Sequence, residues 1–164
     1  MKAERTTFHT GRHEQRMRAA RDDSYKPVAK MPDPAVCPRC HASYTKGRWT
    51  WHKAAEDAVR QKCPACQRIE DRFPGGYLTL KGSYFAAHRA EVLNVIAARE
   101  ARARAEHPMQ RLIGLENTSE GALVTTTDPH LARGLAIAVH EAFKGDLDLA
   151  FSKDENLVRA TWSR

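Results

Sequence analysis

Apolar and polar residues follow two clear periodicities in the second half of the chain. Residues 77–81 alternate between apolar and polar side chains, which predicts a half-buried strand. Beyond it, apolar residues recur at helical spacing and predict a helix over 84–106, with Ser83 as its cap and His107-Pro108 as its stop. The apolar side of this helix is formed by Phe85, Val92, Leu93, Ile96 and Ala103.

The same pattern continues to the C-terminus. A carboxylate at Asp128 and a proline at Pro129 predict the start of a second helix, and Gly145 its end. The apolar face of this second helix carries Leu131, Leu135, Val139, Ala142 and Phe143. Strands are expected around 111–116, 122–126, 147–151 and 157–162. Residues 73–164 are therefore predicted to form an α+β domain, ferredoxin-like in its βαββαβ order, with an extra C-terminal strand.

Residues 34–72 lack this periodicity and hold all four cysteines of the chain. The cysteines form two C-x2-C pairs with 22 residues between them: Cys37, Cys40, Cys63 and Cys66. A two-residue gap lets both sulfurs of a pair face one metal at about 2.3 Å. The spacing predicts a zinc-binding module, with a short helix expected over 54–60. The alternatives are four buried, inert thiols, or two disulfides if the protein is secreted.

The predicted metal is structural rather than catalytic. Four thiolates fill the tetrahedral shell of one Zn²⁺ and leave no position for a reactive water. No phosphate-binding loop, H-E-x-x-H sequence or nucleophile elbow occurs in the chain. We therefore expect a binding protein and not an enzyme.

Residues 1–33 are rich in cations and poor in large apolar side chains, so this segment cannot bury enough surface to fold alone. We expect a basic flexible arm. It is either a solvated tail without a role, or a segment that orders along phosphates and releases their counterions. The second interpretation assigns phosphate contacts to Arg12, Arg16 and Arg18.

Aromatic and basic residues alternate inside the predicted zinc module. The candidates for nucleic-acid contact in this stretch are Lys46, Arg48, Trp49, Trp51 and Lys53. Aromatic faces among cations stack nucleobases while the cations hold the backbone. However, a zinc module has almost no core of its own, which favours a role for Trp49 and Trp51 in shielding the metal or docking the module on its neighbour.

Charge and the lack of long apolar runs define the class of partner and the compartment. The 164 residues hold 27 Lys and Arg against 20 Asp and Glu, a formal net charge of +7. The isoelectric point is about 9.5, which favours polyanions such as nucleic acid as partners. The first residues form no apolar signal core, and no run approaches the roughly 18 apolar residues of a membrane helix. We expect a cytoplasmic protein without a membrane partner.

Three segments resemble a known family. They are Cys63-Pro-Ala-Cys66-Gln-Arg, the strand Gly75-Gly76-Tyr77-Leu78-Thr79-Leu80-Lys81, and Leu123-Val-Thr-Thr-Thr-Asp128 with His130-Leu-Ala-Arg133. Over residues 36–162 the chain resembles bacterial zinc-ribbon proteins. These are themselves similar to the archaeal and eukaryotic export and assembly adaptor of the large ribosomal subunit, the nonsense-mediated-decay-protein-3-like family. That family has additional C-x2-C pairs and domains, so only the zinc role of the four cysteines carries over. The resemblance implies association with the ribosome or ribosomal RNA.

Taken together, these patterns predict a non-enzymatic, zinc-stapled factor that binds ribosomal RNA or the ribosome, in assembly, silencing or quality control. Two alternatives stay open. A ferredoxin-like domain can serve as a small-ligand sensor, with a site at strand–helix turns such as 75–83. The module can also be an adaptor for protein partners, with Trp49 and Trp51 as anchors.

Overall fold

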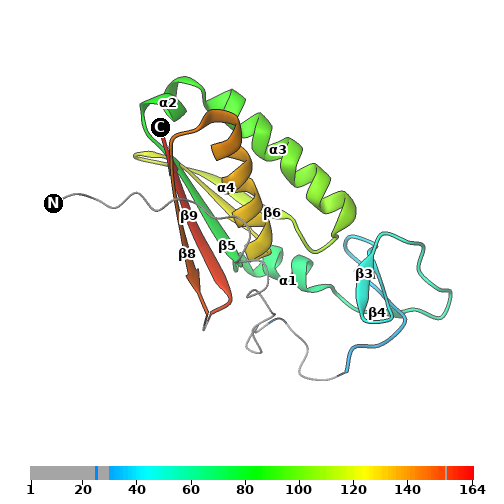
Figure 1. Cartoon of the computed structure of the whole chain (residues 1–164). Coiled ribbons are helices and arrows are strands. Elements are labelled where there is room, and N and C mark those ends of the chain that lie inside the picture. Colours follow the sequence, from blue (N-terminus) through cyan, green and yellow to red (C-terminus); the bar gives the residue numbers. More distant parts are fainter. Residues whose placement is uncertain (1–24, 26–29, 154) are drawn as a thin grey trace.

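Two sheets of different size organise the protein, and each corresponds to one of the predicted regions (Figure 1). The computed structural model describes residue 25, residues 30–153 and residues 155–164. Nearly all of the predicted basic arm, including Arg12, Arg16 and Arg18, lies outside the described residues. No helix in the described part of the chain is long and apolar enough to cross a membrane.

The larger sheet, with its helices, forms what we call the body, residues 73–164. Its strands are β5 (Gly76–Lys81), β6 (Leu112–Thr118), β7 (Gly121–Thr126), β8 (Asp146–Ser152) and β9 (Leu157–Ser163). They lie in the order β6-β7-β5-β9-β8. All neighbours are antiparallel except β5 and β9, which are parallel.

Three helices cover one face of this sheet: α2 (Ser83–Ala87), α3 (Arg89–Glu106) and α4 (Pro129–Phe143) (Figure 1). Leu78 and Leu80 of β5 point toward them and lie between Val124 and Ala122 of β7 and the paired residues of β9. The largest buried side chain is Trp162, whose indole N–H donates to the carbonyl of Lys144 at 2.6 Å. The apolar face predicted over 84–106 is confirmed, with Phe85 in α2 and its other residues in α3. Leu131, Leu135 and Val139 of α4 are buried as predicted, whereas Ala142 is exposed.

The strand order departs from the ferredoxin-like expectation. A ferredoxin-like sheet is antiparallel, and the strand that follows the second helix lies beside the first strand. Here β8 follows α4 but lies at the edge, and β9 takes the place next to β5. The alternate residues Val158, Ala160 and Trp162 of β9 are all buried, whereas Leu147 and Leu149 of β8 are only partly buried. The strand that buries more of its side chains thus occupies the inner position. The mixed α+β class is confirmed, and the ferredoxin-like order is not.

Two local predictions in the body need correction. The single helix predicted over 84–106 is divided at His88, and Gly82 rather than Ser83 is the N-cap of α2. No side chain caps α2; instead the carbonyl of Arg164 accepts the N–H groups of Tyr84 and Phe85. The carbonyl of Arg164 thus takes the capping role that was predicted for Ser83.

The smaller sheet belongs to what we call the module, residues 34–72. It has the order β3-β2-β1-β4, and its strands are β1 (Ala35–Val36), β2 (Ser43–Thr45), β3 (Arg48–Thr50) and β4 (Val59–Arg60). The helix predicted over 54–60 is wrong, because β4 pairs in parallel with β1 there. Val59 N–H donates to the carbonyl of Pro34, and Gln61 N–H to that of Val36. This non-local pairing overrides the local helix propensity.

Candidate metal centre

Two tight backbone structures bring the four cysteines together. Cys37 directly follows β1, and the knuckle that contains Cys40 closes when the N–H of His41 donates to the carbonyl of Cys37. The second pair begins helix α1 (Pro64–Asp71). Cys63 is its N-cap, and its sulfur accepts the N–H of Cys66 at 3.4 Å. The sequence analysis missed this helix, although proline at a first helical position is a recognised start signal.

The four sulfurs form a compact cluster. One atom from each of Cys37, Cys40, Cys63 and Cys66 lies within 4.8 Å of the others, and all four are free thiols. A tetrahedral zinc site with Zn–S bonds of about 2.3 Å has sulfur–sulfur edges of about 3.8 Å. The sulfurs of Cys40 and Cys63 are 3.7 Å apart. The donor set therefore fits one thiolate-bound metal ion, as the cysteine spacing predicted.

Burial and backbone hydrogen bonds shift the pKa values of Cys37, Cys63 and Cys66 in different directions. Burial raises the pKa of Cys63 and of Cys66. For Cys37 burial acts in the same direction, but hydrogen bonds from backbone N–H groups, that of Cys63 first, outweigh it and lower the pKa to about 6. The donor N–H of Cys63 lies 3.4 Å from the sulfur of Cys37. Backbone donors thus stabilise the thiolate form that a metal requires.

An arginine from the body completes the surroundings of the sulfurs. Arg111 lies between α3 and β6 and is only 6% exposed. Its guanidinium donates to the sulfurs of three cysteines: Cys40 at 3.3 Å, Cys63 at 3.2 Å and Cys66 at 3.5 Å. The sequence analysis missed this residue. Nothing in the local sequence marks it, because it contacts cysteines that are 45 to 71 positions away.

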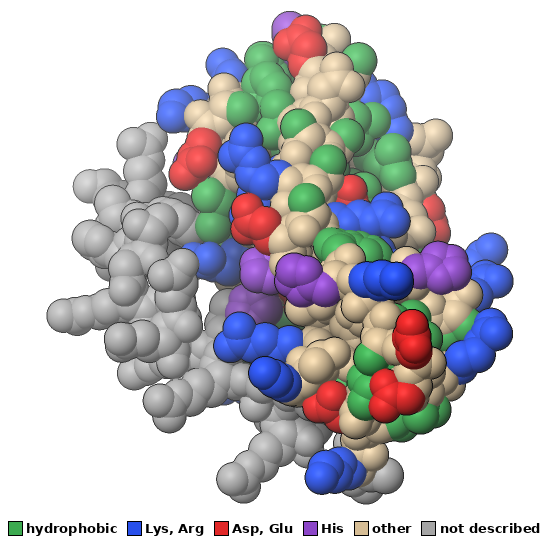
Figure 2. Space-filling model, turned by 90° about the vertical axis from the view of Figure 1, so that its right-hand side faces the viewer, with side chains coloured by type: hydrophobic (Ala, Val, Ile, Leu, Met, Phe, Trp, Pro, Cys, Tyr) green, Lys and Arg blue, Asp and Glu red, His purple; other side chains and the backbone are tan. Residues whose placement is uncertain are grey.

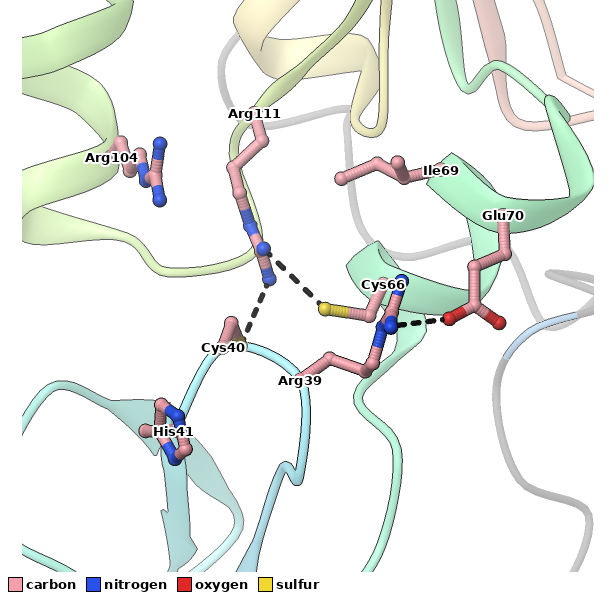
Figure 3. Close-up of a pocket in the computed structure, with 8 residues that line it drawn as sticks. All are labelled: Arg39, Cys40, His41, Cys66, Ile69, Glu70, Arg104 and Arg111. Atoms are coloured by element: carbon pink, nitrogen blue, oxygen red, sulfur yellow. Dashed lines mark hydrogen bonds and ion pairs between the residues drawn. The ribbon is translucent and has the colours of Figure 1, made fainter.

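A cavity of about 430 Å³ opens beside the cluster, where the module meets the body (Figure 3). It is lined by Arg39, Cys40, His41, Cys66, Ile69, Glu70, Arg104 and Arg111. Arg39 is held by an ion pair with Glu70, at 3.0 Å. Arg104 and Arg111 approach from the body side, and Cys40 and Cys66 come from the two knuckles. Two of the four clustered cysteines therefore border this cavity.

The two tryptophans of the module have structural contacts. Trp49 is partly buried, packs on the cysteine cluster and lies 5.3 Å from the ring of Tyr44. Trp51 is 39% exposed, and its indole N–H donates to the carbonyl of Arg104 at 2.6 Å. The Arg104 guanidinium also lies over the Trp51 ring, at 6.0 Å. Trp49 therefore shields the cysteine cluster, and Trp51 connects the module to the end of α3.

The cations predicted to contact nucleic acid lie on the outer part of the module. Lys46, Arg48 and Lys53 are all exposed. Within the described part of the chain, no ion pair joins any of the three to a carboxylate. By contrast, Arg39 and Lys62 are both paired with Glu70. Figure 2 faces the side of the molecule that bears the module, where Lys, Arg and His side chains form a broad band.

Comparison with known proteins adds no family: no protein-family model, curated protein or solved structure matches this chain.

Proposed function

We propose that this protein is a non-enzymatic, zinc-binding factor that associates with ribosomal RNA or the ribosome. In this proposal one structural Zn²⁺ is held by Cys37, Cys40, Cys63 and Cys66. The metal gives a fixed shape to a module too small to have an apolar core of its own. The module in turn presents cations to phosphates, and the basic arm with Arg12, Arg16 and Arg18 extends the same contact.

The observation that carries the proposal is the set of unpaired cations on the module. Lys46 lies in the turn between β2 and β3, Arg48 begins β3, and Lys53 follows β3. They are exposed, and their charges are not neutralised by carboxylates among the described residues. Asp33, which lies near this turn, accepts the backbone N–H of Lys46 at 2.9 Å. Exposed cations on a rigid turn favour a polyanionic partner.

The tryptophan contacts refine the roles within this proposal. Trp49 packs on the sulfurs, so we assign it to the module's own stability. Trp51 keeps 39% of its surface exposed, next to the guanidinium of Arg104. Stacking of a base therefore falls to Trp51 alone, and Arg104 joins Lys46, Arg48 and Lys53 as a phosphate contact.

The proposal is tested by fractionating lysate on a sucrose gradient, with and without nuclease. We expect the wild-type protein to travel with ribosomal particles or their RNA, and to shift to light fractions after nuclease treatment. The test variant is K46Q/R48Q/K53Q. The matched control, K81Q/K153Q/R159Q, removes the same charge from β5, β9 and the β8–β9 turn. Equal loss in both variants would contradict a contact through the module, and association that survives nuclease would instead favour a protein adaptor.

Salt dependence provides a quantitative check of the electrostatic contact. Each phosphate contact that is removed should reduce the slope of log K against log salt by about 1. The module variant should therefore show a slope reduced by about 3 if all three cations bind phosphates. Removing residues 1–24 should flatten the slope further while retaining Tyr25, whose ring packs at 5.5 Å from Phe73. A binding constant independent of salt would rule out this account.

A further inference from the structure

The guanidinium of Arg111 is enclosed where the module meets the body. Besides its three contacts with sulfur, its Nε donates to the carbonyl of Pro108 at 2.8 Å. Its backbone N–H donates to the hydroxyl of Thr127 at 2.9 Å. The hydroxyl of Thr127 in turn donates to the carbonyl of Met109 at 2.6 Å. Arg111 is therefore held in place by the body while its charged end reaches the cysteines of the module.

A buried guanidinium requires a negative partner, because removing its charge from water is costly. Among the described residues no ion pair joins Arg111 to a carboxylate. The nearest source of negative charge is the cysteine cluster. Four thiolates around one Zn²⁺ carry a net charge of −2, and one guanidinium reduces it to −1. The metal centre and Arg111 therefore compensate each other's charge.

Two other side-chain contacts between module and body lie close to the same point. Met109 packs directly on the cysteine cluster. Trp51 donates to the carbonyl of Arg104 at the end of α3, in an exposed position where a hydrogen bond contributes little. Of these contacts, only that of Arg111 joins a buried charge of the body to the metal ligands. Its strength depends on whether the sulfurs are held as metal thiolates.

We infer that Arg111 couples metal binding to the docking of the module on the body: the metal-thiolate cluster holds its guanidinium, and loss of the metal releases the module. This inference rests on the metal part of the proposed function and not on the RNA contact. Arg111 is here a positioning residue that supports the sulfur ligands through hydrogen bonds and adds no ligand of its own. Such outer partners of metal ligands orient them and tune the metal.

The test begins with the zinc content of the purified protein, for which we expect one ion per chain. Two variants then change Arg111. R111M keeps most of the length without charge, and R111K keeps the charge without the planar fork that reaches three sulfurs. The matched control is R102M, which removes an exposed arginine of α3. Zinc transfer to a chromophoric chelator is measured for all four proteins.

We expect R111M to lose about 10- to 100-fold in zinc affinity, as is typical when an outer partner of a metal ligand is removed. R111K should be intermediate, and R102M should resemble the wild type. A spectroscopic readout distinguishes tuning of the sulfurs from general destabilisation. In the Co²⁺-substituted protein, the sulfur-to-metal charge-transfer band should move to lower energy in R111M, because its thiolates lose hydrogen-bond donors. Unchanged zinc affinity together with an unchanged band would overturn the inference.

Docking is measured by hydrogen exchange in the wild-type protein, so a variant that fails to fold does not block the test. Removing zinc should speed exchange both in residues 48–52 of the module and in residues 104–112 of the body. If residues 104–112 stay protected without zinc, the coupling is wrong. A wild-type protein that binds no zinc would overturn this inference together with the metal part of the proposed function. Zinc binding without any effect of Arg111 would overturn the inference alone.

Discussion

The module and the body are stabilised by different means. The body has a continuous core of aliphatic and aromatic side chains from its sheet and from three helices. The module has strands of two or three residues, and its buried cluster consists of cysteines and Ala65, with Cys40, Trp49 and Met109 packed against it. A region this poor in apolar contacts cannot offset its loss of conformational entropy by burial alone. The difference indicates that the body is able to fold without metal and that the module is not.

Removing the metal should therefore have the largest effect and should divide the molecule. For the variant C63S, or after chelation of the wild type, we expect residues 35–66 to lose slowly exchanging amides while the sheet of the body keeps them. Structural zinc contributes about 10–16 kcal/mol in isolated zinc modules, more than strands of this length can replace. Two-dimensional NMR with hydrogen exchange measures both regions in one sample. Cooperative unfolding of β5 and α4 together with the module would contradict independent stabilisation.

A change in the core of the body should produce the reverse result. Leu135 is fully buried between α4 and the sheet, so L135A should cost about 2–5 kcal/mol in the free energy of unfolding. Zinc content should stay at the wild-type value as long as the body remains folded. Urea unfolding gives the first quantity and metal analysis the second. F151A is a suitable control, because Phe151 is 42% exposed and its loss should cost far less. Release of zinc from folded L135A would show that the two regions are not independent.

The features that followed from sequence are those determined by local spacing. Two C-x2-C pairs predict a sulfur cluster because each knuckle is closed by its own backbone hydrogen bonds. Asp128 and Pro129 predict the start of α4 because a cap acts within one turn, and Leu131 N–H donates to the Asp128 carboxylate at 3.0 Å. In both cases the interacting groups lie within a few residues of each other.

The features that were missed depend on contacts between distant segments. The pairing of Val59 with Ala35 replaced a predicted helix by β4. The insertion of β9 between β5 and β8 depends on which of two similar strands buries more apolar surface, which is settled only when the sheet packs on its helices. Arg111 is one of many arginines in the chain, and only the fold shows that it reaches the sulfurs. Each of these features is a tertiary effect that overrides a local preference.

The smallest predicted effect concerns Asp128, the N-cap of α4 in the body. Burial raises the pKa of Asp128. Because the folded protein then binds this proton more tightly than the unfolded chain does, this group lowers stability as pH rises from the unfolded value of about 3.9 through the higher folded value. D128N cannot ionise but still offers an oxygen to the N–H of Leu131. At pH 7 it should equal or exceed the wild type in stability.

D128A, in contrast, loses the cap and should be about 1 kcal/mol less stable than D128N at every pH, within the range of measured N-cap substitutions. Urea unfolding of the three proteins at several pH values between 4 and 7 measures both effects. The comparison is made between proteins at the same pH, so that loss of metal from the module in acid, which is common to all three, cancels. The advantage of D128N over the wild type should grow with rising pH. If D128N is instead as unstable as D128A at pH 7, the ionised carboxylate stabilises the start of α4 despite its burial, and the body then depends on a buried charge as the module does.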